Sequence, residues 1–157
     1  MLLRSQMKRT PLRRKAAKPR RTTLPRCTVQ RCKRIARISN GMCKTHGEVL
    51  ADTRMSLWIR NRAGNRCEAE GWFGFDCKPP LVCAHGWGRG YHATRYTPEN
   101  LLALCSAHHI FVDTHQAHKD SLWTAKIGAP RWQALREIAV LGEKREDAIE
   151  AALEFLA

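Results

Sequence analysis

The stretch that decides the fold is residues 81–109, LVCAHGWGRGYHATRYTPENLLALCSAHH. Its histidines, asparagine and cysteine follow one spacing pattern, His85-x14-Asn100-x4-Cys105-x2-His108-His109. Cys105 and His108 have the spacing of half a zinc site, in which two ligands one turn apart reach a single tetrahedral ion. His109 would then point away from that ion, which leaves its imidazole free for other chemistry.

Hydrophobic runs on either side of this pattern predict two strands and a helix. The run Leu-Val-Cys-Ala before His85 and the run Leu-Leu-Ala-Leu after Asn100 are short and apolar, as buried strands are. A glycine-rich loop at 86–91 lies between them, and Ser106 is expected to begin a helix. Strand, loop, strand and helix within about thirty residues predict a ββα unit.

The remaining apolar residues recur at helical spacing and predict helices on both sides of this unit. Gly128 and Gly142 are expected to end two of them, because glycine is the usual residue just past a helix. The tryptophan and aliphatic stripes of these helices are expected to form the core. The fold class is therefore α+β, with helices over about 48–62, 122–127, 130–141 and the residues after Gly142.

The charge of the chain is concentrated in its first third. Residues 1–47 hold fifteen Lys and Arg and no acid, whereas residues 48–157 are near neutral, so the net charge of +14 comes from the start of the chain. A basic arm on a neutral body indicates a tether to a polyanion, and nucleic acid is the expected partner. The alternative is a solubility tail. The arm residues expected to contact phosphates are Arg13, Arg14, Lys15, Arg20 and Arg21.

Residues 1–26 carry three prolines and almost nothing that could form a core, so we expect them to be disordered alone. Met7 is an alternative start of the chain. The apolar run after Met1 is too short for a signal peptide or a membrane span. The seven cysteines, several beside histidines, are therefore expected to bind zinc in a reducing cytoplasm rather than to form disulfides.

The first zinc site is predicted within residues 27–47, a zinc knuckle. Its ligands would be Cys27, Cys32, Cys43 and His46, and the basic residue Arg34 lies among them as a candidate for contact with nucleic acid. Twenty residues cannot bury a core, so four ligands on one Zn²⁺ would supply the folding free energy instead.

With these residues the chain resembles the HNH (His-Asn-His) endonucleases of the ββα-metal, or His-Me finger, superfamily, in particular small phage-type members. The resemblance covers about residues 66–128 and is carried by His85, Asn100, Cys105, His108 and His109. His108 stands where the family has a second cysteine, and the two residue types are interchangeable as zinc ligands. The resemblance implies a zinc-stabilised ββα-metal core with flanking helices, behind a zinc knuckle and a disordered basic arm.

The resemblance also implies a role for each residue of the site. His85 would be the general base, since imidazole titrates near pH 7, and Asn100 would hold the loop that carries it. His109 would bind a catalytic divalent ion, Mg²⁺ or Mn²⁺, with Zn²⁺ or Ni²⁺ as alternatives. Arg89 and Arg95 would grip the phosphate. The products would carry 5′-phosphate and 3′-hydroxyl ends.

The second structural Zn²⁺ needs four ligands, of which Cys105 and His108 supply two. Cys67 is the third by resemblance, because the family has a thiol at that place. The fourth is Cys77 or Cys83. Cys77 would pair with Cys67 across a nine-residue loop and is preferred, whereas Cys83 would be a buried thiol of the strand.

The chain departs from the family immediately before the base, where an Asp or His ligand is usual and Ala84 stands here. Three explanations stay open. The ion could bind weakly, with water and DNA phosphate completing its shell. His85 could bind the ion while His92 serves as base, or the enzyme could be impaired. Some phage-type members have a small residue there, which favours an active enzyme.

We therefore expect a metal-dependent DNA endonuclease, phage-encoded and acting in homing, recombination or packaging, in the host cytoplasm. Its partners would be DNA and other phage recombination or packaging proteins, and no membrane. The alternatives are a non-catalytic zinc protein that regulates by binding DNA, and a ribosome-type RNA-binding zinc protein. The expected parts are 1–26 (arm), 27–47 (knuckle), 48–65 (connecting helix), 66–128 (nuclease core) and 129–157 (C-terminal helices).

Overall fold

The computed structural model describes residues 24–142 and 144–157. The phosphate-binding residues predicted in the arm, Arg13, Arg14, Lys15, Arg20 and Arg21, lie outside the described residues. The described chain combines helices with one small sheet, so the α+β class is confirmed. Within these residues, no helix has both the length and the apolar character needed to cross a membrane.

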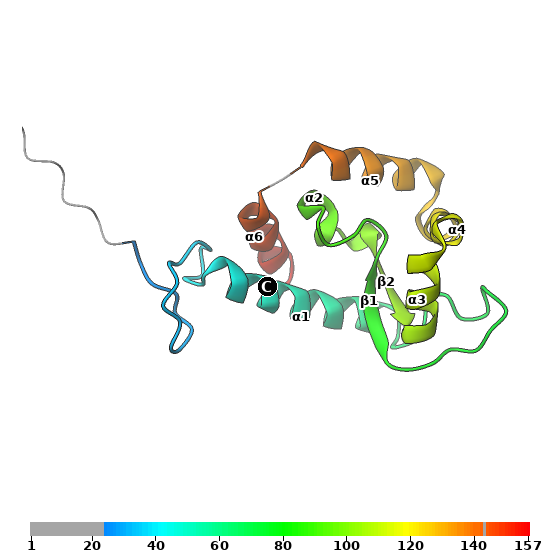
Figure 1. Cartoon of the computed structure of the whole chain (residues 1–157), viewed down its shortest axis with the longest axis horizontal. Coiled ribbons are helices and arrows are strands. Elements are labelled where there is room, and N and C mark those ends of the chain that lie inside the picture. The colour runs from blue at the N-terminus through cyan, green and yellow to red at the C-terminus, as the bar shows by residue number, and fades with distance from the viewer. Residues whose placement is uncertain (1–23, 143) are drawn as a thin grey trace, which may run out of the picture.

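The first long element is α1, Lys44–Arg62, which runs along one side of the molecule (Figure 1). It begins directly after Cys43, inside the predicted knuckle, so the boundary expected between residues 47 and 48 falls within a continuous helix. Met55 and Ile59 lie one turn apart on its buried face. The knuckle is thus joined rigidly to the body of the protein rather than through a linker.

The sheet is an antiparallel hairpin of β1, Leu81–His85, and β2, Leu101–Cys105. The register pairs His85 with Leu101 and Leu81 with Cys105. Between the strands lie a one-turn helix α2, His92–Arg95, and a 3-10 turn η1, Pro98–Asn100. The hairpin places His85 at one end of the sheet and Cys105 at the other.

Four helices follow the hairpin: α3, Ser106–Thr114; α4, Gln116–Ile127; α5, Ala129–Leu141; and α6, Arg145–Phe155. The start of α3 is capped by Cys105, whose sulfur accepts a hydrogen bond from the backbone N–H of His108. Gly128 ends α4 at φ +86°, and Gly142 follows α5 at φ +74°. Both are left-handed conformations that glycine adopts without steric cost, as the sequence indicates.

Alternation along the strands places a hydrophobic cluster on each face of the hairpin. One cluster joins Cys83, Leu101 and Ala103 to residues of α1 and α6. The other joins Ala84, Leu102 and Leu104 to α3, α4 and α5. Figure 1 shows α6 lying across α1, and α5 spanning from α4 back toward α6. The hairpin is therefore held between two layers of helix, which fixes the end that carries His85.

Candidate functional site

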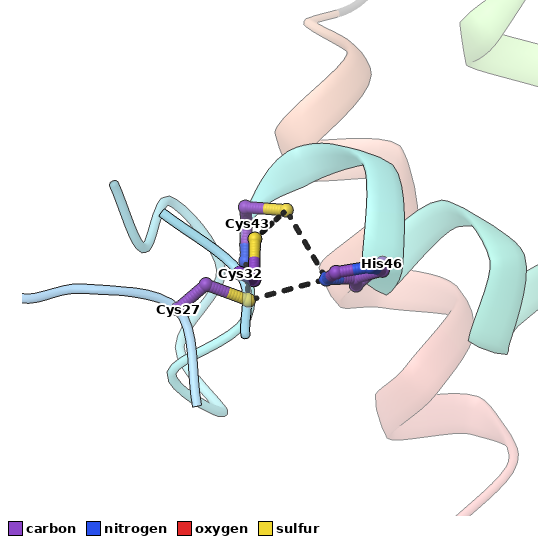
Figure 2. A group of neighbouring side chains, drawn as sticks. All are labelled: Cys27, Cys32, Cys43 and His46. Atoms are coloured by element: carbon purple, nitrogen blue, oxygen red, sulfur yellow. Dashed lines mark hydrogen bonds between the residues drawn. The ribbon is translucent and has the colours of Figure 1, made fainter. Parts of the chain in front are cut away.

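The first candidate metal site lies in the knuckle, where three sulfurs and one imidazole converge (Figure 2). The Nδ1 of His46 lies 3.3 Å from Cys27 Sγ and 3.5 Å from Cys43 Sγ. Cys32 Sγ is 3.9 Å from Cys43 Sγ. All four ligand atoms lie within 4.8 Å of one another, although Cys27 and His46 are nineteen positions apart in the sequence.

These separations match the edges of a zinc tetrahedron. With Zn–S and Zn–N bonds of about 2.3 and 2.0 Å, tetrahedral geometry places the ligand atoms about 3.5–3.8 Å apart. A Cys₃His set of this size fits Zn²⁺, and the four predicted ligands are the four that the fold brings together. Arg34 lies exposed beside the cluster, where its guanidinium donates a hydrogen bond to the Thr45 hydroxyl.

Backbone contacts hold the knuckle in place around its ligands. The N–H of Cys43 donates to the Cys27 sulfur at 3.1 Å, a contact that favours the thiolate a metal needs. Gly41 turns the chain at φ +80°, and an added Cβ there would lie 2.8 Å from a Thr28 methyl carbon. His46 lies in the first turn of α1, so the site also anchors that helix.

A second Cys₃His cluster lies at the far end of the hairpin from His85, and it contains Cys67, Cys77, Cys105 and His108. The Nδ1 of His108 is 3.2 Å from Cys105 Sγ, 3.4 Å from Cys67 Sγ and 3.6 Å from Cys77 Sγ. His108 is fully buried, and its other ring nitrogen, Nε2, has no hydrogen-bond partner. This cluster also fits Zn²⁺ by its size and donor set.

The loop before β1 delivers two of these ligands through backbone pairing. The N–H of Glu68 donates to the Ala103 carbonyl at 2.8 Å, which sets Cys67 beside β2. Ser106 donates through both its N–H and its hydroxyl to the Lys78 carbonyl, which ties the residue after Cys77 to the start of α3. Phe73 and Phe75 then pack over the His108 ring.

Cys83, the alternative fourth ligand, lies elsewhere. It is buried in the hydrophobic cluster between the hairpin and α1, and burial raises the pKa of its thiol to about 12. Of the two alternatives left by the sequence, the structure brings Cys77 into the cluster and leaves Cys83 in the core.

The candidate reaction centre is an open cleft of about 230 Å³ at the His85 end of the hairpin. His85 comes from β1 and His109 from α3, so the two histidines predicted as reactive share one cleft. Besides Cys83 and Gly88, its walls are His85, Arg89, His109, Asp113 and Lys119. Arg89 and Lys119 are basic and Asp113 is the one acid among the lining residues, so the cleft has an excess of positive charge that suits an anion.

His85 is held uncharged by its surroundings. Burial, and after it the positive charges of Arg89 and Arg95, lower the pKa of His85 to about 4. Its imidazole is therefore neutral at pH 7 and keeps a lone pair that can accept a proton.

Asn100 is fully buried and fixes the loop that follows His85. Its Nδ2 donates to the carbonyls of Trp87 (3.0 Å) and Thr94 (2.9 Å), and its Oδ1 accepts from the Trp87 N–H at 2.7 Å. The N–H of Gly86 also donates to the Asn100 carbonyl at 2.8 Å. These contacts lock the backbone immediately after His85, which is the task expected of this residue.

Two cleft residues, Asp113 and Lys119, are absent from the sequence predictions. The Asp113 carboxylate lies between two side chains: Oδ2 is 3.2 Å from His109 Nε2, and Oδ1 is 2.8 Å from Lys119 Nζ. His109 and Asp113 are four residues apart on one helix, a spacing that places side chains side by side. That spacing is a signal in the sequence from which Asp113 could have been found.

The residue that departs from the family pattern, Ala84, faces away from the cleft. It is fully buried in the cluster formed with α3, α4 and α5. His92, the alternative base, lines a separate apolar hollow between α2 and α6 and does not line the cleft. Of the two histidines, His85 lines the cleft and His92 does not.

Arg95 corrects an expectation from the sequence. It was expected to grip phosphate, but its guanidinium is buried, at 8 % exposure, and pairs with Glu48 and Asp52 of α1. Glu48 also pairs with Arg145 of α6. Arg95 thus joins α2 to α1 within a buried ion network, and Arg89 is the arginine that lines the cleft.

We expect Arg95→Ala to destabilise the protein by about 1–3 kcal/mol, because Asp52 loses its ion pair and Glu48 keeps only Arg145. The exposed Arg89→Ala should stay within about 0.5 kcal/mol of wild type. Urea unfolding followed by circular dichroism measures both. Equal losses for the two variants would contradict the structural position of Arg95.

The chain by itself thus presents two Cys₃His clusters that fit zinc and one cationic cleft with two histidines and a carboxylate. The first cluster lies in the knuckle and fixes the start of α1. The second fixes the start of α3, the helix that carries His109 of the cleft. No known protein family, curated protein or solved structure matches this chain.

Proposed function

We propose that this protein is a metal-dependent HNH-type endonuclease that hydrolyses phosphodiester bonds of DNA. The observation that carries the proposal is the shared cleft, in which His85 at a strand end faces the same hollow as His109 on α3. The second Cys₃His cluster supports it, because the residue before His109 is a ligand of that cluster. One structural ion would therefore fix the helix on which His109 stands.

In this account His85 accepts the proton of the water that attacks the phosphorus. A pKa of about 4 leaves the imidazole neutral at pH 7, the form that accepts a proton, and makes His85 a weaker base than an ordinary histidine. Asn100 holds the His85 loop through its contacts with Trp87 and Thr94, so the imidazole keeps one orientation. Arg89 is placed on the cleft wall to pair with a phosphate oxygen. The products would carry 5′-phosphate and 3′-hydroxyl ends.

His109 and Asp113 are the residues that would hold the catalytic divalent ion, Mg²⁺ or Mn²⁺. Their Nε2 and Oδ2 atoms lie 3.2 Å apart, close to the edge of about 3 Å of an octahedron with 2.1 Å bonds. When bound, such an ion neutralises charge on the phosphorane and on the departing 3′ oxygen. Outside the two Cys₃His clusters, the described residues form no third group of three or more ligands. Water and DNA phosphate would therefore complete the coordination shell.

The basic first third of the chain supports DNA as the substrate. Lys and Arg outnumber acids fifteen to none over residues 1–47, and Arg34 is exposed on the knuckle. Contacts of this kind release counterions from the phosphate backbone, so affinity should fall steeply with salt. They supply affinity and little sequence information. Action beside phage recombination or packaging proteins stays part of the proposal.

The proposal is tested by incubating the purified two-zinc protein with supercoiled plasmid and Mg²⁺ or Mn²⁺. We expect nicked or linear DNA, and none when excess EDTA is added at the start. Zinc content is measured in parallel so that loss of folding is not mistaken for loss of the catalytic ion.

The second candidate is a non-catalytic zinc protein that binds DNA. The specific observation that favours it is the missing third ligand around His109 and Asp113 within the described chain. Tight, salt-sensitive DNA binding without cleavage by any divalent ion would establish this candidate and overturn the nuclease.

A further inference from the structure

A second hollow, of about 420 Å³, shares two structural elements with the cleft. It is lined by Trp87, Gln116, Asp120, Trp132, Gln133 and Arg136, and we refer to it as the tryptophan pocket. Trp87 follows His85 by two residues, and Asp120 follows the cleft residue Lys119 on α4. The volume lies within the range of small-molecule sites, about 300–1,000 Å³. The two hollows are therefore built on the same two elements, the loop after β1 and the first turns of α4.

One wall of the tryptophan pocket is a rigid aromatic platform. The rings of Trp87 and Trp132 are stacked, with centroids 5.1 Å apart and 22° between their planes. Trp132 also packs against Trp123, with ring centroids 5.9 Å apart. The backbone at Gly86 contacts the same ring so closely that an added Cβ there would lie 2.7 Å from it. Trp132 is buried, at 8 % exposure, so the partly exposed Trp87 is the ring on which a base would stack. An aromatic ring stacks nucleobases whatever their sequence, because every base has a π-face.

A polar part of the lining, at the edge of the Trp132 ring, offers an acceptor. Asp120 Oδ1 accepts hydrogen bonds from Gln116 Nε2 (2.9 Å) and from Trp132 Nε1 (3.3 Å). No hydrogen bond within the described chain uses Asp120 Oδ2. This oxygen can accept a hydrogen bond from an exocyclic amino group, which cytosine, adenine and guanine carry and thymine lacks.

The outer rim of the tryptophan pocket suits the backbone of a nucleic acid. Gln133 and Arg136 are exposed on α5, and Arg136 makes no ion pair with any described residue. A phosphate next to the bound base would thus find a cation at the rim.

We propose that the tryptophan pocket binds one unpaired nucleobase that carries an exocyclic amino group, beside the phosphate in the cleft. A base inside a duplex is stacked and paired on its Watson–Crick edge, so it cannot enter without leaving the helix. The substrate class is therefore DNA with an unpaired base, such as a bulge, a flap or a branch point. The choice of DNA as the polymer rests on the proposed function.

The test compares three fluorescein-labelled duplexes: one fully paired, one with a single bulged cytosine and one with a single bulged thymine. Fluorescence anisotropy measures their affinity for the two-zinc protein without added divalent ion. We expect the bulged cytosine to bind at least about fivefold more tightly than the paired duplex, through stacking and the contact to Asp120. The bulged thymine should gain less.

Asp120→Asn is the decisive variant. The asparagine keeps one oxygen for Gln116 and Trp132, so the fold is preserved, and replaces the second oxygen with an amino group that donates. The preference for cytosine over thymine should then disappear or reverse. Lys126→Ala, which removes an exposed cation from the same helix, is the matched control and should weaken all three duplexes by the same factor.

Equal affinity of the wild-type protein for the three duplexes would overturn the inference, as would unchanged discrimination in Asp120→Asn. These results are separable from the fate of the nuclease. Cytosine-selective binding by a protein that does not cleave DNA would support the tryptophan pocket and reject the nuclease. Cleavage of DNA without any preference for unpaired bases would support the nuclease and reject base binding in the tryptophan pocket.

Discussion

Cys105→Ser is expected to remove one Zn²⁺ from the protein and to unfold its core. Cys105 is a member of the second Cys₃His cluster and the cap of α3, so two features depend on its sulfur. Structural Zn²⁺ contributes about 10–16 kcal/mol of apparent binding free energy in zinc-finger peptides. That equals or exceeds the whole stability of an ordinary domain, about 5–15 kcal/mol.

The matched control for this variant is Cys83→Ala, which changes a buried cysteine that lies outside both clusters. Metal analysis should give two Zn²⁺ per chain for the wild type and for Cys83→Ala, and one for Cys105→Ser. Thermal melts by circular dichroism should show a cooperative transition only for the first two. Two Zn²⁺ in Cys105→Ser, or one in Cys83→Ala, would contradict the assignment of the cluster.

His109→Ala is expected to lower the rate of DNA cleavage by about 100- to 1,000-fold, the usual loss when charge stabilisation in a transition state is removed. His109 supplies one of the two side chains that would hold the catalytic ion. It is not a member of either Cys₃His cluster, so zinc content should stay at two per chain. DNA affinity should be unchanged, because the arm and knuckle carry most of the basic charge.

The control for His109→Ala is His118→Ala, which changes an exposed histidine of α4 that does not line the cleft. Single-turnover rates on a labelled duplex, measured over a range of Mn²⁺ concentrations, give both the rate and the ion requirement. Equal losses of rate in the two variants, or a His109→Ala rate within threefold of wild type, would show that His109 does not hold the catalytic ion.

The zinc ligands show what could be predicted from the sequence. Cys43 with His46, and Cys105 with His108, have ligand spacings set by a single helical turn, so local geometry is enough to pair them. Cys77 could only be preferred over Cys83, because its position depends on the pairing of the Lys78 carbonyl with Ser106. Such contacts between distant segments leave no periodic mark in a sequence.

Arg95 shows where sequence reasoning fails. In the sequence it stands in a basic loop near the histidines, and nothing distinguishes it from Arg89. In the fold α2 turns Arg95 toward Glu48 and Asp52, more than forty positions earlier. The two arginines thus differ in long-range packing alone.

Helix boundaries were predicted less well than the presence of helices. The first helix begins at Lys44 rather than near residue 48, because Cys43 serves as its cap within the knuckle. The helix expected over 122–127 begins at Gln116, since its first turns are polar and carry little apolar periodicity. The short helix α2 was not predicted, because one turn is too short to show a period.

The most direct test of the account is the cleavage of supercoiled plasmid by wild-type protein and by His85→Ala, at equal zinc content and equal DNA affinity. We predict Mg²⁺- or Mn²⁺-dependent cleavage by the wild type that falls by about 100- to 10,000-fold in His85→Ala, the range for loss of a general base. Cleavage by His85→Ala at the wild-type rate would contradict it, because the base would then lie outside the cleft that His85 and His109 share.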